Sequence, residues 1–477
     1  MRHVSRRTID RGVCGRSQDV LATAFACRNG LLSVGFVGWR PAGCELFRRV
    51  PYSAALAIHQ SGTMFMQQQS IHTHQFENGL LLIVEEMPGL QSAAFSFLVP
   101  AGSIYDGFGK NGSASMLADW ITRGAGPRDS RELTATLDNL GIAHSQSAGS
   151  ENITFTAASV ADRVTDGLEI FADVILRPHL DEGQFEPVKL GAEQSLIAAE
   201  DDPQRKAMVE LRKLSFSSPW GLSSDGSLDD LSNISSDDVR GHHERCFRPN
   251  GAILGVAGNV DAKVVIEAVG QYFGDWEQKD GAAVEPGDCG PKRTFLEHES
   301  AQTHIGISYN SVSFPDPDYY AAWAAVSVLS GGMSARLFTE VREKRGLCYS
   351  VYASQASLKH EGRVLCYAGT SNERAQETLD VTLQELKRLG DGIDESELQR
   401  CKARAKSSLV MQQESSRGRA GSLARNWFFL EKTRTLDEVR QKIDALTVDS
   451  ILEYVNRRPA QDFTVLTIGP KELKVND

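Results

Sequence analysis

The sequence lacks the features that would tie a chain to a membrane, to nucleic acid or to an oxidising compartment. Its 477 residues include eight cysteines, and no two of them form a C-x-x-C pair. Scattered thiols of this kind indicate a reducing compartment rather than a disulfide framework. No apolar run is long enough to span a bilayer. The net charge of −11 argues against nucleic acid or an anionic membrane surface as the main partner.

The composition is that of a globular protein except at the N-terminus. With 41% hydrophobic and 24% charged residues, the chain can form two or more domains. Residues 1–60 differ, since they contain nine arginines, three acids and no lysine. This resembles an organelle transit peptide, although the true start could also be Met64 or Met66. We favour a disordered or over-long extension over residues 1–66, and a cytoplasmic protein. The alternative is the mitochondrial matrix, if residues 1–60 are a transit peptide.

The remaining chain has an α+β pattern that occurs twice. A strand, an Asn-Gly turn and a second strand are expected over 74–85. Several later elements have counterparts further along the chain: strand 93–100 with 303–310, helix 113–122 with 318–330, helix 186–200 with 395–414, and strand 252–258 with 463–469. A period near about 200 residues is too long for a solenoid and predicts a duplicated domain. We expect two homologous domains, 67–276 and 294–477, joined by a Gly- and Pro-rich linker at 277–293. Each would be a mainly antiparallel sheet covered by helices.

The stretch from Gly331 to Ala353 combines a helix and a strand. A glycine pair and Ser334 precede an amphipathic run, which is typical of a helix start. Gly346 should end the helix, and the next residues alternate as in a strand. Arg342 and Tyr349 could then meet on one surface, where a guanidinium and a phenol can donate hydrogen bonds to a developing oxyanion. The alternative is that both are ordinary surface residues.

A second group invites a metal interpretation but does not support one. His242 and His243 lie next to each other in a helix expected over 234–246. Adjacent helical residues point to different faces, so the two imidazoles cannot easily share an ion. We interpret this helix as structural.

The sequence SARLFTEVREKRGLCYSVYA resembles the signature of the second half of pitrilysin/insulinase-type metallopeptidases. In that family an Arg and a Tyr seven positions apart contact the peptide substrate, and Arg342 and Tyr349 have this spacing. The resemblance covers about Phe76 to Lys471. It implies the clam-shaped, LuxS/processing-peptidase-like metallohydrolase fold, with Arg342 and Tyr349 as the substrate-contacting pair.

The zinc motif of the family is altered in this chain. The first half of the family contains G-x-A-H-x-x-E-H, which aligns with residues 112–119. Ser115 and Asp119 replace the two histidines, Ala118 replaces the glutamate, and the third ligand falls at Ser195, close to Glu193. Serine is a poor zinc ligand, and alanine cannot accept a proton from a bound water. We therefore expect no metal in this chain.

These features predict a non-catalytic, substrate-contacting subunit of a heterodimeric zinc peptidase. Its partner would be a homologous subunit with an intact H-x-x-E-H motif and the zinc, and the substrates would be short or unfolded peptides. The chain would be inactive alone. The alternative is a non-enzymatic scaffold, like the core subunits of respiratory complexes. The sequence leaves open the peptide specificity, the identity of the partner and the choice between a homodimer and a heterodimer.

Overall fold

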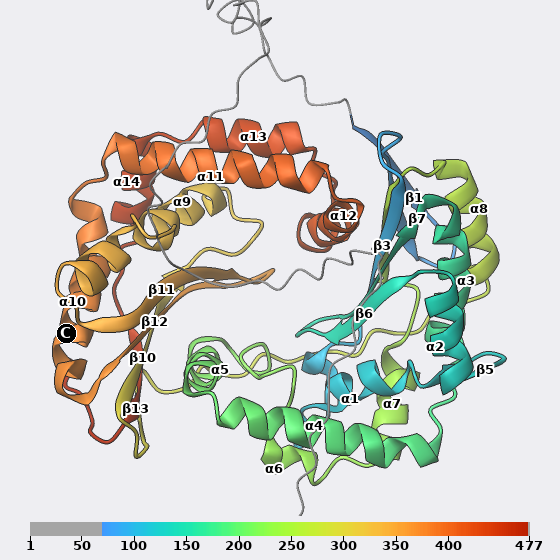
Figure 1. Ribbon diagram of the computed structural model, residues 1–477, viewed down its shortest axis with the longest axis horizontal. Coiled ribbons are helices and arrows are strands. Elements are labelled where there is room, and N and C mark those ends of the chain that lie inside the picture. Colours follow the sequence, from blue (N-terminus) through green and yellow to red (C-terminus); the bar gives the residue numbers. More distant parts are fainter. Residues whose placement is uncertain (1–68, 476–477) are drawn as a thin grey trace, which may run out of the picture. The chain divides into compact units, whose positions relative to one another are not determined.

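Two β-sheets organise residues 69–475, which this computed structural model describes (Figure 1). The strand order of the first sheet is β1 (Ser70–Gln75), β2 (Leu81–Glu86), β8 (Ile253–Gly258), β3 (Ser92–Val99), β7 (Ile153–Val160) and β6 (Ala143–Ala148). The order of the second is β11 (Cys348–Ser357), β12 (Gly362–Ser371), β10 (Gln302–Ser311), β13 (Thr464–Gly469) and β9 (Arg293–Glu297). The β2–β8 and β13–β9 pairs are parallel, and the other neighbours are antiparallel. The predicted α+β fold class is confirmed, whereas the predictions for residues 1–66 lie outside the described residues.

Helices accompany both sheets. In the first half they are α1 (Ser113–Trp120), α2 (Ser130–Asn139), α3 (Val164–Leu176), α4 (Phe185–Glu200), α5 (Pro203–Ser215), α6 (Leu228–Leu231), α7 (Ser236–Cys246) and α8 (Ala262–Phe273), with a short ribbon of β4 (Gly124–Ala125) and β5 (Arg128–Asp129). In the second half they are α9 (Tyr319–Ser330), α10 (Ala375–Lys387), α11 (Glu395–Gln413), α12 (Ser416–Leu430), α13 (Leu436–Asp444) and α14 (Val448–Arg457). Among the helices between residues 69 and 475, none combines the length and hydropathy that crossing a bilayer requires.

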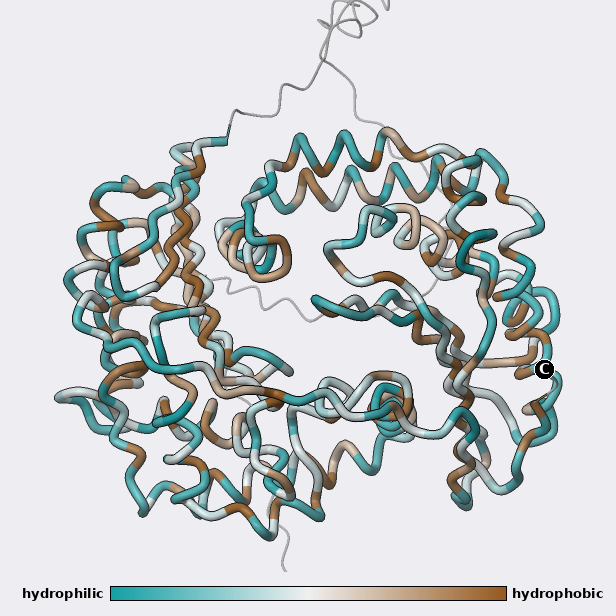
Figure 2. Tube along the Cα trace, turned by 180° about the vertical axis from the view of Figure 1, so that it is seen from behind, coloured by the Kyte–Doolittle hydropathy of each residue, from teal (hydrophilic) through white to brown (hydrophobic). Residues whose placement is uncertain are grey.

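The first sheet buries both of its faces, because successive strand side chains point to opposite sides. Leu82 and Phe97 belong to the large core shared with α3 and α8. Leu81 and Ile83 point the other way and pack against α12, which comes from the second half of the chain. Figure 2 shows the hydrophobic strands of this sheet in brown. Burial on both sides explains why these strands are continuously apolar rather than alternating.

The second sheet is covered in a reciprocal way by a helix of the first half. Leu211 and Leu214 of α5 pack against Leu365 and Leu466 of the second sheet. The helix pairs α4–α5 and α11–α12 thus occupy equivalent places in the two halves. The second helix of each pair packs against the sheet of the other half. This exchange supports the predicted duplication. The exact domain bounds stay a prediction.

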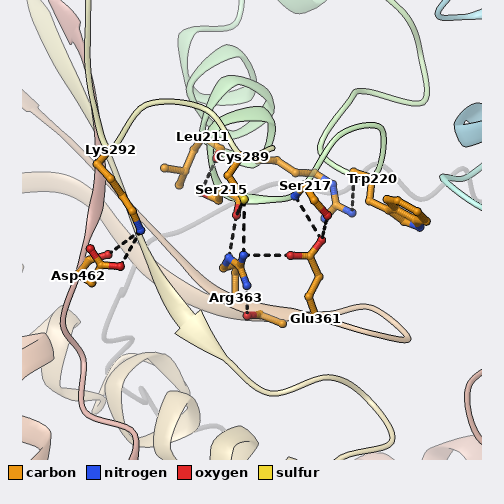
Figure 3. A network of polar contacts seen from close by, with 11 residues as sticks. Leu211, Ser215, Ser217, Trp220, Cys289, Lys292, Glu361, Arg363 and Asp462 are labelled. Carbon is orange, nitrogen blue, oxygen red and sulfur yellow. Dashed lines mark hydrogen bonds and ion pairs between the residues drawn. The ribbon is translucent and has the colours of Figure 1, made fainter. Parts of the chain in front are cut away.

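The predicted linker contacts the end of α5, where this helix packs on the second sheet (Figure 3). The backbone N–H of Gly290 donates to the carbonyl of Leu214 at the end of α5, at 3.1 Å. Arg363 on β12 donates through Nε to the carbonyl of Ser215, at 2.7 Å, and its Nη2 lies 3.0 Å from Glu361 Oε2. The Gly- and Pro-rich composition predicted a simple spacer, and the structure instead connects it to α5.

The sequence mispredicted or missed several local elements. The helix expected from Ser334 begins later and is a π-helical turn over Phe338–Glu343. Residues 436–457 form two helices rather than one, because Thr447 starts α14 with a capping box. Two of the missed elements have a clear physical reason. β6 is largely polar and exposed, and α12 contains two glycines, which lower its intrinsic helix propensity.

Candidate functional site

Arg342 and Tyr349 lie next to each other in the structure. Leu337 and Val341 are fully buried and anchor the π-helical turn that carries Arg342. Gly346 then takes a positive φ of 59°, which turns the chain into β11. The Cζ atom of Arg342 lies 5.6 Å from the ring centroid of Tyr349, a distance typical of a cation–π contact. The predicted proximity of the two side chains is therefore present.

A β-bulge gives Tyr349 its exposure. Cys348 pairs with Thr370 and Ser350 with Gly369, so Tyr349 is the extra residue between two pairs of the ladder. Bulges of this type redirect a side chain and are frequent near functional sites. The side chain of Tyr349 is 81% exposed, and β11 is the edge strand of its sheet. The pair thus stands at a strand edge where backbone groups can pair with another chain.

Arg342 differs from the other basic residues of its turn. Lys344 Nζ lies 2.7 Å from Glu340, and Arg345 Nη1 lies 3.1 Å from the same carboxylate. The hydrogen bond from Lys344 is the main reason that the pKa of Glu340 is lowered. In residues 69–475 no carboxylate pairs with Arg342, whose guanidinium lies only against aromatic rings. Its N–H groups are available to donate to a hydrogen-bond acceptor of a bound ligand.

The positions that align with the zinc motif have other contacts. Asp119 accepts a hydrogen bond from Nη2 of Arg123, which follows the end of α1, at 2.9 Å. Ala118 is buried in the core, and Ser115 is half-buried. Ser195 is exposed on α4, which packs against α1. Within residues 69–475 no cluster of three or more His, Cys, Asp or Glu side chains could hold a metal ion. These residues do not fit zinc.

A buried pair that the sequence did not single out holds the start of α1. The carboxylate of Asp106 accepts from the N–H groups of Gly112 and Ala114, at 2.8 and 3.0 Å. It lies 3.4 Å from Nδ1 of His242, whose Nε2 is 2.9 Å from the carbonyl of Ala101. Burial raises the pKa of Asp106 to about 7 and lowers that of His242 to about 4. The only sequence signal is an acid ahead of a helix start.

His243 is likewise engaged with the protein backbone. Its Nε2 lies 3.1 Å from the carbonyl of Ile175. The two imidazoles of the His-His pair therefore contact separate carbonyl groups, Ala101 and Ile175. This arrangement agrees with the structural interpretation of the helix.

Comparison with known families identifies the family of this chain. Residues 81–217 match the family described as "Insulinase (Peptidase family M16)", and residues 233–405 match "Peptidase M16 inactive domain". Together with the duplicated α+β architecture, the two matches define a chain that is related to the M16 peptidases. The chain belongs to the insulinase family, peptidase family M16.

Relatives of similar length align with most of this chain. The "Uncharacterized zinc protease YmxG" of Bacillus subtilis is 26% identical over 405 residues, which are 84% of this chain and 98% of that protein. An "Uncharacterized zinc protease" of Rickettsia bellii is 22% identical over 408 residues, covering 85% and 99% of the two chains. These relatives are named as zinc proteases, whereas this chain lacks the zinc motif.

Solved structures show the same fold. A peptidase M16 inactive domain from Pseudomonas fluorescens superposes with a TM-score of 0.79 at 21% identity, covering 85% of this chain and all of that one. A protease from Helicobacter pylori gives 0.77 at 21% identity, covering 84% and 100%. A chain of Complex III2 from Candida albicans gives 0.74 at 18% identity, covering 85% and 98%. At these identities the likeness shows the fold alone.

Proposed function

We propose that this chain is the non-catalytic, substrate-contacting subunit of a two-chain zinc peptidase. The observation that supports it best is a contrast between two sites. Within residues 69–475 Arg342 has no ion-pair partner and lies beside the exposed Tyr349, whereas Asp119 on α1 is paired with Arg123 and Ala118 has no functional group. One half can thus contact a substrate, and the other cannot hold the metal. A homologous partner with an intact H-x-x-E-H motif would supply the metal and the activated water.

The substrate would be a short or unfolded peptide that binds in an extended conformation. β11 and β6 each lie at one edge of their sheets, and an edge strand offers main-chain groups to any sequence. Arg342 would hold the substrate carbonyl through its planar donors, and the Tyr349 hydroxyl would donate to the same oxygen as negative charge develops. We place the protein in the cytoplasm, with the mitochondrial matrix as the alternative.

The test is reconstitution with an H-x-x-E-H homologue from the same genome. Arg342→Ala and Tyr349→Phe should each lower the kcat of the complex by roughly 10²–10³, the usual cost of removing one oxyanion donor. Arg345→Ala is the matched control, because Arg345 lies on the same turn but pairs with Glu340. Unchanged peptidase activity in both variants, in a complex that still assembles, would refute the proposal.

A second candidate function is a scaffold without a peptidase partner. The likeness to a chain of Complex III2 favours it, although that likeness is one of fold. A scaffold needs no accessible Arg–Tyr pair. Isolation of the native protein in a stable assembly that contains no H-x-x-E-H subunit would favour the scaffold over the peptidase subunit.

A further inference from the structure

Two cavities meet at Arg404, away from the Arg342–Tyr349 pair. One, of about 410 Å³, lies between α9, β11 and α11. The other, of about 750 Å³, lies between α11 and the loop 331–335 that follows α9. Four residues line both cavities: Ser327, Gly331, Cys401 and Arg404. The guanidinium therefore stands at the junction of one continuous depression.

The charge around this junction is positive. Arg404 is exposed and has no hydrogen bond or ion pair within residues 69–475. Glu397 is the one carboxylate among the residues that line the two cavities, and it is paired with Arg336 at 2.6 Å. Burial raises the pKa of the Cys401 thiol, and Arg404 and Arg400 both oppose that rise. The cavities thus hold two cationic side chains without a free anion.

The loop is built to let Arg404 approach. A Cβ atom on Gly331 would lie 2.9 Å from Nη1 of Arg404 and 2.2 Å from the carbonyl oxygen of Ser327, so only glycine fits there. The larger cavity is mostly apolar, with Val328 and the 76%-exposed Met333 among its lining residues. In the smaller one, Oε1 of Gln355 is buried without a hydrogen-bond partner. A ligand with a carboxylate for Arg404 and an adjoining apolar group for the larger cavity would suit these surroundings, whereas the Gln355 oxygen, itself an acceptor, would need an N–H donor of the ligand.

The edge strand β11 connects the two sites. Tyr349 and Gln355 lie on the same strand, six residues and therefore roughly 20 Å apart. A peptide that pairs with β11 at Tyr349 would reach the cavities after about six residues.

We propose that Arg404 binds the C-terminal carboxylate of the peptide, with the last side chain in the larger cavity. Arginine suits a carboxylate because its planar donors can bind both oxygens at once. This proposal rests on the proposed function. It adds that the subunit recognises the peptide by its carboxyl end.

The test is peptide binding to the full-length chain without its partner, followed by fluorescence polarisation. The probe is an N-terminally labelled hexapeptide of five alanines and a leucine, as the free acid and as the C-terminal amide. The free acid should bind at least about tenfold more tightly, because only the free acid can form a hydrogen-bonded ion pair with Arg404. Arg404→Gln should remove that difference. Arg400→Gln should leave most of it, and Ala403→Phe should weaken the leucine peptide by filling the larger cavity.

The outcomes separate this proposal from the proposed function. Equal binding of acid and amide, or a preference that survives Arg404→Gln, would overturn the carboxylate site while the Arg342 and Tyr349 test remains valid. An amidated peptide ending in glutamate that binds as tightly as the free acid, again through Arg404, would support a carboxylate site that takes a side chain instead of the terminus. Because Arg404 is exposed, the variants should fold normally, and circular dichroism checks this.

Discussion

The face of α1 and the edge of β11 are the two places where this chain can be compared with an active peptidase. On α1 the polar group is neutralised, since Asp119 pairs with Arg123. At β11 the polar groups are presented, since Tyr349 is exposed at a bulge and Arg342 has no carboxylate partner in the described residues. A surface guanidinium gains little from an ion pair, so leaving it unpaired costs the fold little. The proposed division of substrate contact and metal chemistry between two chains rests on this difference.

A second comparison concerns the two exchanged helices. α12 binds the first sheet through apolar residues and through a fully buried ion pair between Arg419 and Glu85, at 2.7 Å. α5 binds the second sheet through apolar residues, while Arg363 at the rim contacts its last carbonyl. Removing one partner of a buried ion pair costs more stability than removing a partly exposed contact. The packing of α12 on the first sheet and that of α5 on the second should therefore respond differently to mutation.

The largest effect is expected from Arg419→Met. The substitution leaves Glu85 buried without its cation, which costs about 3–5 kcal/mol in comparable cases. Urea unfolding of the chain measures this loss. Arg417→Met is the matched control, because Arg417 is on the same helix but exposed, and it should cost far less. Equal losses for the two variants would mean that α12 is held by its apolar face alone.

A pH-dependent effect is expected at Asp106. Its pKa is raised to about 7 in the folded chain from an ordinary 3.8, so the folded state binds the extra proton between these values. The stabilisation is complete below about pH 4 and is lost as the pH rises through about 7. Relative to Asp106→Asn, the wild-type chain should therefore lose stability across this window.

His242 has the opposite dependence, and the comparison with Asp106→Asn separates the two. Its pKa is lowered to about 4 from 6.5, so its contribution is present above pH 6.5 and is lost as the pH falls towards 4. The other groups whose charges act on the two side chains are Arg245, Asp230 and His243. Since His242 and these groups remain in both proteins, the difference between wild type and Asp106→Asn reports mainly on Asp106. A difference independent of pH would contradict the buried, protonated carboxyl.

An intermediate effect is expected from Arg363→Gln. Arg363 is largely buried and joins β12 to the end of α5 through the Ser215 carbonyl. Loss of this charge-assisted hydrogen bond and of the contact with Glu361 should lower the free energy of unfolding by about 1–3 kcal/mol. Urea unfolding again gives the value. A loss of stability as large as that of Arg419→Met would remove the contrast between α12 on the first sheet and α5 on the second.

The sequence could predict what depends on neighbours along the chain. The strand–turn–strand at 74–85 follows from alternation and from an Asn-Gly pair, and the meeting of Arg342 with Tyr349 follows from a seven-residue turn. It could not predict the ion pair of Arg419 with Glu85, because 334 residues separate the partners and nothing local records the pairing. The polar strand β6 was missed for a related reason, since an edge strand needs no apolar alternation.

The smallest effect is expected from Asp119→Ala. Its ion pair with Arg123 is half exposed and spans one helical turn, so its loss should change stability by less than about 0.5 kcal/mol. In the reconstituted complex, peptide hydrolysis should also stay within about twofold of wild type, against the 10²–10³ expected for Arg342→Ala. If Asp119→Ala instead lowered kcat as strongly as Arg342→Ala, while the complex assembled normally, the face of α1 would take part in catalysis. The contrast between the two sites, and with it the division of labour between two chains, would then be wrong.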